Sequence, residues 1–266
     1  MKRTVLFLCS LAICICAAGC RQLPDTAPTE QTQPPVQQYS PPPAPAHYWE
    51  LILTGRRYIT YQRDLLEVEY SDADFGITPT VCTTDFDGDG IDDLSDLLAG
   101  AKLDAAVCPT YDAAYYGGGY PPDDIGVCAD VVWRAFKSAG LCLRDMVDRD
   151  VRMRPAAYTK IQYRDNNIDF RRVPNLHVFF DAYAQELTTD IRDIDQWQAG
   201  DIVIFKDDGH IGIVSDIRNW RGQPFIIHNA GQPDRDEDYI RKLKIIGHYR
   251  FDLSLLPEYL QIAWHE

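Results

Sequence analysis

The stretch Gly117–Gly140, GGGYPPDDIGVCADVVWRAFKSAG, decides the fold of this chain. Its first half is crowded with glycine, proline and aspartate, which favour loops. From Cys128 onward apolar residues recur at the spacing of one helix face, and Gly140 stands where a helix end favours a left-handed residue. The pattern therefore predicts a loop followed by a half-buried helix that begins at or near Cys128.

A cysteine at the start of a helix is a candidate nucleophile. The first N–H groups of a helix have no partner within the helix, and the helix dipole is positive at this end. Both effects favour a thiolate over a thiol. We therefore expect Cys128 to be reactive. The alternative is a small buried hydrophobic residue, which is what most single helix cysteines are.

The composition of the chain limits its class and its partners. The 266 residues are 45% hydrophobic, which suits one domain with a sizeable core plus appendages. The formal charge is -14. Because nucleic-acid binding is driven by basic side chains that meet phosphates, this balance argues against a nucleic-acid partner. The negative net charge indicates solubility but does not identify a substrate. The composition does not predict the oligomeric state.

The N-terminal segment has the pattern of an export signal. Residues 1–19 combine a basic start, an apolar run and small residues before Cys20. The ending AAGC resembles the bacterial lipobox, which predicts that Cys20 is lipidated; a plain signal peptide is the alternative. Residues 20–46 are rich in proline and glutamine and predict a disordered tether. We therefore expect an exported lipoprotein anchored in a membrane of the cell envelope.

Residues 47–266 are expected to form a single domain. Residues 49–70 are compatible with a helix or a strand. Beyond them, periodicity predicts helices at 95–106, 128–140, 143–154 and 174–186, and strands at 201–205, 210–216, 224–228 and 245–251. Helices first and short antiparallel strands later are typical of an α+β domain.

Two histidines stand at the ends of neighbouring predicted strands. His210 opens the strand HIGIVSD, and His228 ends the strand FIIH. Antiparallel pairing of these strands would bring both histidines to the same end of the sheet. If the predicted helix packs across that end, Cys128, His210 and His228 meet as nucleophile, general base and orienting residue. A histidine at a strand end is more often a structural residue whose hydrogen bonds are satisfied. The hypothesis of a catalytic site therefore depends on Cys128, His210 and His228 occurring together.

The ordered phrases YYGGGYPPDDIGVCADVVWRAF, QAGDIVIF, HIGIVSD and FIIHNAG resemble the NlpC-type cell-wall peptidases, which are papain-like cysteine hydrolases that cut the peptide stems of bacterial peptidoglycan. The phrases NIDFRRVPNLHVFF and GHYR look typical of a branch of that clan catalogued as a domain of unknown function. The resemblance implies a papain-like fold with N-terminal helices packed on a small antiparallel sheet. It also implies Cys128 as nucleophile, His210 as general base and His228 as the third polar residue.

The resemblance further implies substrate-binding residues beside the thiol. A tyrosine of the preceding loop would line the site, and Tyr115, Tyr116 and Tyr120 are the candidates, of which spacing favours Tyr115. Asn229, directly after His228, is expected to contact substrate as well. The residues that flank the cysteine depart from the usual aspartate before it and Ser-Gly after it, so substrate selection near the thiol can differ.

The function implied by the resemblance is cleavage of an amide bond in peptidoglycan stem peptides through a thioester, without a cofactor for catalysis. Two other functions stay open. One is a non-catalytic lipoprotein that binds the cell wall or a peptide in the same groove. The other is a thiol acyltransferase or amidase that acts on a different substrate.

An acidic loop, DFDGDGIDDLSD, precedes the first predicted helix. Acids fall at positions 1, 3, 5, 9 and 12 of this loop and glycine at position 6, which is the logic of a calcium loop, with a backbone carbonyl at position 7. The alternative is an acidic turn that caps the following helix. The residues expected to bind Ca²⁺ are Asp85, Asp87, Asp89, Ile91, Asp93 and Asp96.

Four cysteines remain when the signal segment and Cys20 are set aside. Cys82 and Cys108 flank the acidic segment 82–108, and because an exported protein permits disulfides, we expect a bond between them. Cys142 would then be a spare thiol. A bond between Cys128 and Cys142 is the alternative, and it would silence the proposed nucleophile.

Overall fold

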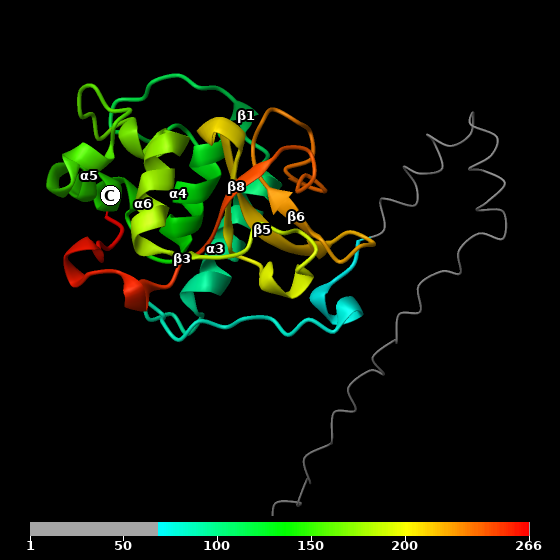
Figure 1. Ribbon diagram of the computed structural model, residues 1–266. Coiled ribbons are helices and arrows are strands. Elements are labelled where there is room, and N and C mark those ends of the chain that lie inside the picture. The colour runs from blue at the N-terminus through cyan, green and yellow to red at the C-terminus, as the bar shows by residue number, and fades with distance from the viewer. Residues whose placement is uncertain (1–68, 266) are drawn as a thin grey trace, which may run out of the picture. The chain divides into compact units, whose positions relative to one another are not determined.

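The structure is a computed structural model that describes residues 69–265 (Figure 1). The predicted signal segment, Cys20, the proline-rich tether and nearly all of the segment 49–70 lie outside these residues. Within residues 69–265, no helix is both long enough and apolar enough to span a bilayer.

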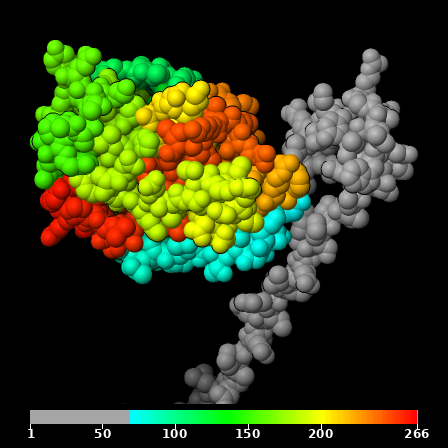
Figure 2. All heavy atoms as spheres, viewed as in Figure 1, coloured from blue at the N-terminus to red at the C-terminus, as the bar shows by residue number. Residues whose placement is uncertain are grey.

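The described chain is an α+β domain, as the order of predicted elements indicated. Its four α-helices precede the main sheet in the chain, and three of them lie together beside it in Figure 1. The helices are α3 (Asp93–Val107), α4 (Cys128–Ser138), α5 (Leu143–Met153) and α6 (Val173–Tyr183). Irregular chain from residue 70 leads along the surface into α3 (Figure 2, cyan).

The main sheet has six strands, and every neighbouring pair is antiparallel. Two further strands, β1 (Thr110–Tyr111) and β2 (Ile125–Gly126), form a separate parallel pair just before α4. Across the main sheet the order is β3 (Gln185–Glu186), β8 (Ile245–Arg250), β4 (Ile202–Phe205), β5 (His210–Arg218), β6 (Pro224–Ile227) and β7 (Asp236–Glu237).

The elements with strong periodicity are confirmed, and the short ones were missed. The predicted helix at 174–186 ends early, at Tyr183, because Gln185 and Glu186 pair with β8 as strand β3. Strands β1, β2, β3 and β7 have two residues each, too few to carry an alternation that sequence analysis can detect.

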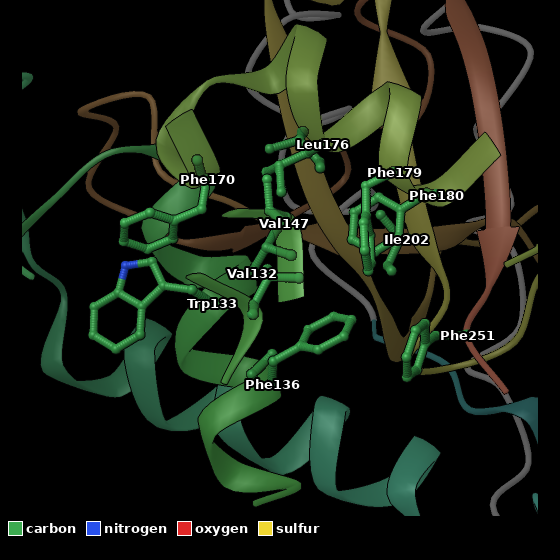
Figure 3. Packing of buried hydrophobic residues seen from close by; sticks show 14 of the residues in the cluster. Val132, Trp133, Phe136, Val147, Phe170, Leu176, Phe179, Phe180, Ile202 and Phe251 are labelled. Carbon is green, nitrogen blue, oxygen red and sulfur yellow. The ribbon is translucent and has the colours of Figure 1, made fainter. Parts of the chain in front are cut away.

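Helix α4 is buried because it lies between α3 and strand β5. Gly100 of α3 makes this approach possible, since a Cβ there would stand 2.8 Å from the Cα of Ala135. On the other side, Val132 and Phe136 of α4 point into the core shown in Figure 3, where Phe136 stacks edge-on against Phe251 at a ring distance of 4.8 Å. The start of α4 is therefore held at a fixed position relative to β5.

The expected disulfide between Cys82 and Cys108 is wrong, because both cysteines are free. The Cys82 N–H donates to Asp92, the N-cap residue of α3, whereas Cys108 is the C-cap residue of the same helix. A 15-residue helix is about 22 Å long at 1.5 Å per residue, while a disulfide needs Cα atoms within about 7 Å. Cys128 and Cys142 are also free.

Strands β5 and β6 approach closely at Gly212, two residues after His210. A Cβ at Gly212 would lie 2.6 Å from Ile226 Cγ2, 2.9 Å from the Ile227 carbonyl oxygen and 3.2 Å from the Cβ of His228. Glycine at this position therefore allows the two strands, and the histidines at their ends, to adopt their observed spacing.

We expect Gly212→Ala to lower the free energy of unfolding by about 1–3 kcal/mol, because an added methyl group overpacks the strand pair. Urea unfolding of the two proteins measures the change. Gly117→Ala is the matched control, since a Cβ there meets nothing within 4 Å and its effect should stay within about 0.5 kcal/mol. Equal stability of Gly212→Ala and the control would contradict the close approach.

Candidate active site

Cys128 is the first residue of α4, and 8% of its surface is exposed. The first turn of this helix is fixed by Asp130, which accepts a hydrogen bond from the Val127 N–H at 2.7 Å. Asp130 is fully buried and binds Arg171 through both carboxylate oxygens, at 2.7 and 2.8 Å, and the Trp133 indole at 2.7 Å. Asp130 therefore has the structural role expected of an acid in the first turn of a helix.

Asn229 fixes the chain just before the cysteine. Its side chain is buried and donates to the carbonyl oxygens of Pro109 and Gly126, both at 3.1 Å, while its oxygen accepts from the Gly231 N–H at 3.0 Å. These bonds tie the end of β6 to β1 and β2. Because both N–H donors are occupied, the substrate-binding role expected for Asn229 gives way to a structural one.

His210 and His228 lie in direct contact at one end of the sheet. His210 opens β5, His228 follows β6, and the two strands pair antiparallel. The His210 Nε2 and His228 Nδ1 atoms are 2.8 Å apart. His228 is fully buried, whereas His210 retains 8% exposure. The sequence analysis anticipated this pairing from the strand pattern.

Cys128 lies against the start of β5, next to this histidine pair. The backbone N–H of Ile211, the residue after His210, interacts with the Cys128 sulfur, as does the N–H of Ala129. The Tyr239 ring is within electrostatic range of the thiol and packs on both imidazoles, with ring distances of 5.4 Å to His210 and 4.1 Å to His228. Because α4 packs on β5, which His210 opens, Cys128 and the two histidines lie in the same region of the fold.

Glu237 lies beside His228, so that Cys128, His210, His228 and Glu237 form a row of side chains. Glu237 was not among the residues predicted from the sequence. Its Oε1 atom is 3.2 Å from His228 Nε2, and its Oε2 atom is 2.5 Å from Lys242 Nζ. Glu237 lies on the two-residue strand β7, opposite Ile226 of β6. The surrounding sequence is rich in charged residues, so nothing local distinguishes this acid from its neighbours.

The carboxylate of Glu237 determines the tautomers of both histidines. A carboxylate only accepts hydrogen bonds, so His228 Nε2 carries a proton and His228 Nδ1 accepts. His210 Nε2 must then be the donor in the bond between the histidines. A neutral His210 therefore keeps an unprotonated Nδ1, which is the atom that can take a proton from a thiol.

Burial dominates the protonation states of the site. It raises the pKa of the Cys128 thiol to about 11, although the N–H groups of Ile211 and Ala129 act in the opposite direction. Burial lowers the pKa of His210 to about 4, and it lowers the pKa of His228 despite the nearby Glu237 carboxylate. Burial thus acts against the thiolate expected from the helix terminus and favours a thiol beside neutral imidazoles.

The tyrosines expected to line the site have other contacts. The Tyr115 hydroxyl donates to Asp165 and accepts from the Asn167 amide, both at 3.0 Å. The Tyr116 ring lies under the Arg171 guanidinium at 5.3 Å.

Tyr111 of β1 pairs with Gly126, two residues before Cys128, and was not among the tyrosines expected to line the site. Burial first, and then the charges of Cys128 and Asp130, raise the pKa of Tyr111. Its side chain is 49% exposed, and Gly231 lies close to its ring. Sequence analysis missed Tyr111 because the family spacing favoured a position nearer to the cysteine.

Acid is expected to destabilise the fold through His210. An unfolded histidine protonates near pH 6.5, whereas folded His210 stays neutral down to about pH 4. Between these values the unfolded state binds more protons, so the free energy of unfolding falls as the pH falls. A pKa unit corresponds to about 1.4 kcal/mol, which gives a loss of about 3 kcal/mol from this residue.

Urea unfolding at pH 7 and pH 4.5 measures this effect. His210→Gln should lose less stability between the two pH values than the wild-type protein does. His265→Gln serves as the control, because the His265 side chain is 58% exposed, and it should behave as wild type. Wild-type acid sensitivity in His210→Gln would contradict the neutral, buried imidazole.

Comparisons with known proteins identify the family of this chain. Residues 98–251 match the family described as a domain of unknown function, DUF1287, and this range contains every side chain of the row from Cys128 to Glu237. The Uncharacterized protein YijF of Escherichia coli (strain K12) is 40% identical over 162 residues, which is 57% of this chain and 78% of that protein. No solved structure matches the chain. The chain therefore belongs to the DUF1287 family.

Proposed function

We propose that this protein is a cysteine hydrolase. Cys128 is the nucleophile, His210 is the general base, and His228 and Glu237 position His210. The observation that carries the proposal is the 2.8 Å contact between His210 Nε2 and His228 Nδ1 beside a cysteine that begins a helix. This contact leaves His210 Nδ1 as the basic nitrogen, in the arrangement that nucleophilic catalysis by cysteine requires.

The reaction proceeds in two steps. As the Cys128 sulfur bonds to the carbonyl carbon of an amide, its proton passes to His210 Nδ1. The backbone N–H of Cys128, in the first turn of α4, can donate to the oxyanion. The C–N bond then breaks, and the leaving amine takes the proton from His210, which leaves a thioester. Water loses a proton to His210 and attacks the thioester, so that the acid is released and the thiol is restored.

The substrate class we infer is the peptide stems of peptidoglycan. The inference comes from the resemblance to the NlpC-type peptidases and from the predicted export signal with a lipidated Cys20. A lipid anchor would hold the enzyme in the cell envelope, where this substrate is found. A papain-like arrangement of helices on an antiparallel sheet is part of the same proposal.

Cys128→Ala is expected to abolish cleavage of purified muropeptides, because catalysis by a nucleophile and its base is lost as a unit, with a decrease of about 10³-fold or more. Mass spectrometry of the products measures turnover. Cys108→Ser is the matched control, since Cys108 is exposed and free, and it should retain full activity. Undiminished turnover by Cys128→Ala would exclude this thiol as the nucleophile.

The same assay separates the open alternatives. If the wild-type protein and the Cys128→Ala variant bind muropeptides equally well and neither cleaves them, the protein is a binding protein. If the wild-type protein leaves muropeptides intact but forms a thioester at Cys128 with other activated acyl donors, it acts on a different substrate. Either result would contradict the proposed peptidoglycan hydrolase.

Glu237→Gln is expected to lower kcat by about 10²-fold or more, because an amide N–H can donate to His228 Nε2 and so reverse the tautomers of both histidines. KM should change little, since Glu237 positions the base and does not touch substrate. Glu258→Gln, a change of an exposed acid, is the control. A KM effect without a kcat effect would contradict the positioning role.

A further inference from the structure

The acidic loop before α3 gathers three exposed carboxylates. One oxygen each from Asp85, Asp87 and Asp89 lie within 4.8 Å of one another. The tight turn of the loop is formed by Gly88 and Gly90, whose φ values are 75° and 95°. Exposed acids in a turn do not by themselves make a binding site.

Two buried carboxylates in the first turn of α3 complete this cluster. Asp93 is 1% exposed and Asp96 is 4% exposed, and the Oδ2 atom of each is buried without a hydrogen-bond partner among residues 69–265. The other oxygen of Asp93 accepts from the Phe86 N–H at 2.8 Å, so its carboxylate faces the loop. Burying a charged oxygen without a partner is costly, so a cation bound beside these two atoms would be stabilising.

Asp96 faces the same point as the other acids. It follows Asp93 by three residues in the first turn of α3, so the two side chains lie on the same side of the helix. Five carboxylates therefore repel one another around one small space. A divalent cation at that space would remove this repulsion and supply the missing partner of both buried oxygens.

We propose that this loop binds one Ca²⁺ ion. A set of oxygens alone, from several carboxylates and one main-chain carbonyl, suits a hard cation with flexible coordination and does not suit a transition metal. Asp93 supplies its oxygen directly or through water, as position 9 of such loops does. The ligands are carboxylate oxygens of Asp85, Asp87, Asp89, Asp93 and Asp96 and the carbonyl oxygen of Ile91.

The site would stabilise the framework that holds the cysteine helix. Asp87 packs against Gly140, just after α4, because a Cβ at Gly140 would lie 2.7 Å from the Asp87 Cβ. The loop also continues directly into α3, which packs along α4. The cation therefore joins the loop, the start of α3 and the end of α4 that is opposite Cys128. Its role is structural and does not depend on the proposed hydrolase activity.

Calorimetric titration of the chelator-treated full-length protein with CaCl₂ tests the proposal. We expect one ion per chain and a rise of the melting temperature by several degrees in millimolar Ca²⁺, with a smaller rise in Mg²⁺. Asp85→Asn should lose both responses. Asp123→Asn, which changes an exposed acid outside the loop, should keep them. No heat of binding and no thermal shift, or equal responses of these two variants, would overturn the proposal.

Asp96→Asn separates loss of the site from misfolding, because misfolding would lower the melting temperature whereas loss of a repelling charge should raise it. Without Ca²⁺, this change removes one of five repelling charges, so the melting temperature in chelator should rise above that of wild type. With Ca²⁺, it removes a ligand, so the variant should no longer respond. Melting of Asp96→Asn below wild type in chelator, or a wild-type Ca²⁺ response, would contradict the site. Cys128→Ala should bind Ca²⁺ as wild type does, which keeps this test separate from that of the hydrolase.

Discussion

The position of the candidate nucleophile depends on the buried ion pair between Asp130 and Arg171. Both side chains are almost fully excluded from water, and two hydrogen bonds join them. Arg171 also donates to the Ala114 carbonyl, so one pair connects the loop before β2, the first turn of α4 and the segment before α6. Loss of either partner would leave an uncompensated buried charge, at a cost of about 3–5 kcal/mol. This constraint holds Cys128 against β5.

Much of the fold and the centre of the site could be predicted from the sequence. Helical periodicity located the helix that begins at Cys128, and the strand pattern placed His210 and His228 at one sheet end. Glu237 and Tyr111 could not be found, because each lies on a strand of two residues, which is too short to show an alternation in the sequence. The expected disulfide was wrong because Cys82 and Cys108 lie at opposite ends of the helix that was itself predicted between them.

The protonation state of the site shows which physical effect prevails there. A helix N-terminus and two backbone N–H groups favour a charged sulfur, whereas burial disfavours it, and burial has the larger effect on Cys128. The helix terminus can be recognised in the sequence, whereas the degree of burial cannot, and this is why a thiolate was expected where burial favours a thiol. In the proposed hydrolase, the row from Glu237 through both histidines would supply a base when the thiol attacks, in place of a permanent ion pair.

The protonated resting form of Cys128 has a consequence for its chemical lifetime. Oxidants and disulfide exchange attack the thiolate, and a thiol with a pKa of about 11 is ionised to only about one part in 10⁴ at neutral pH. Cys128 is therefore expected to react slowly with peroxide and with small disulfides. In the proposed hydrolase, this burial would let the nucleophile persist in an oxidising compartment, where an exposed thiolate would be consumed.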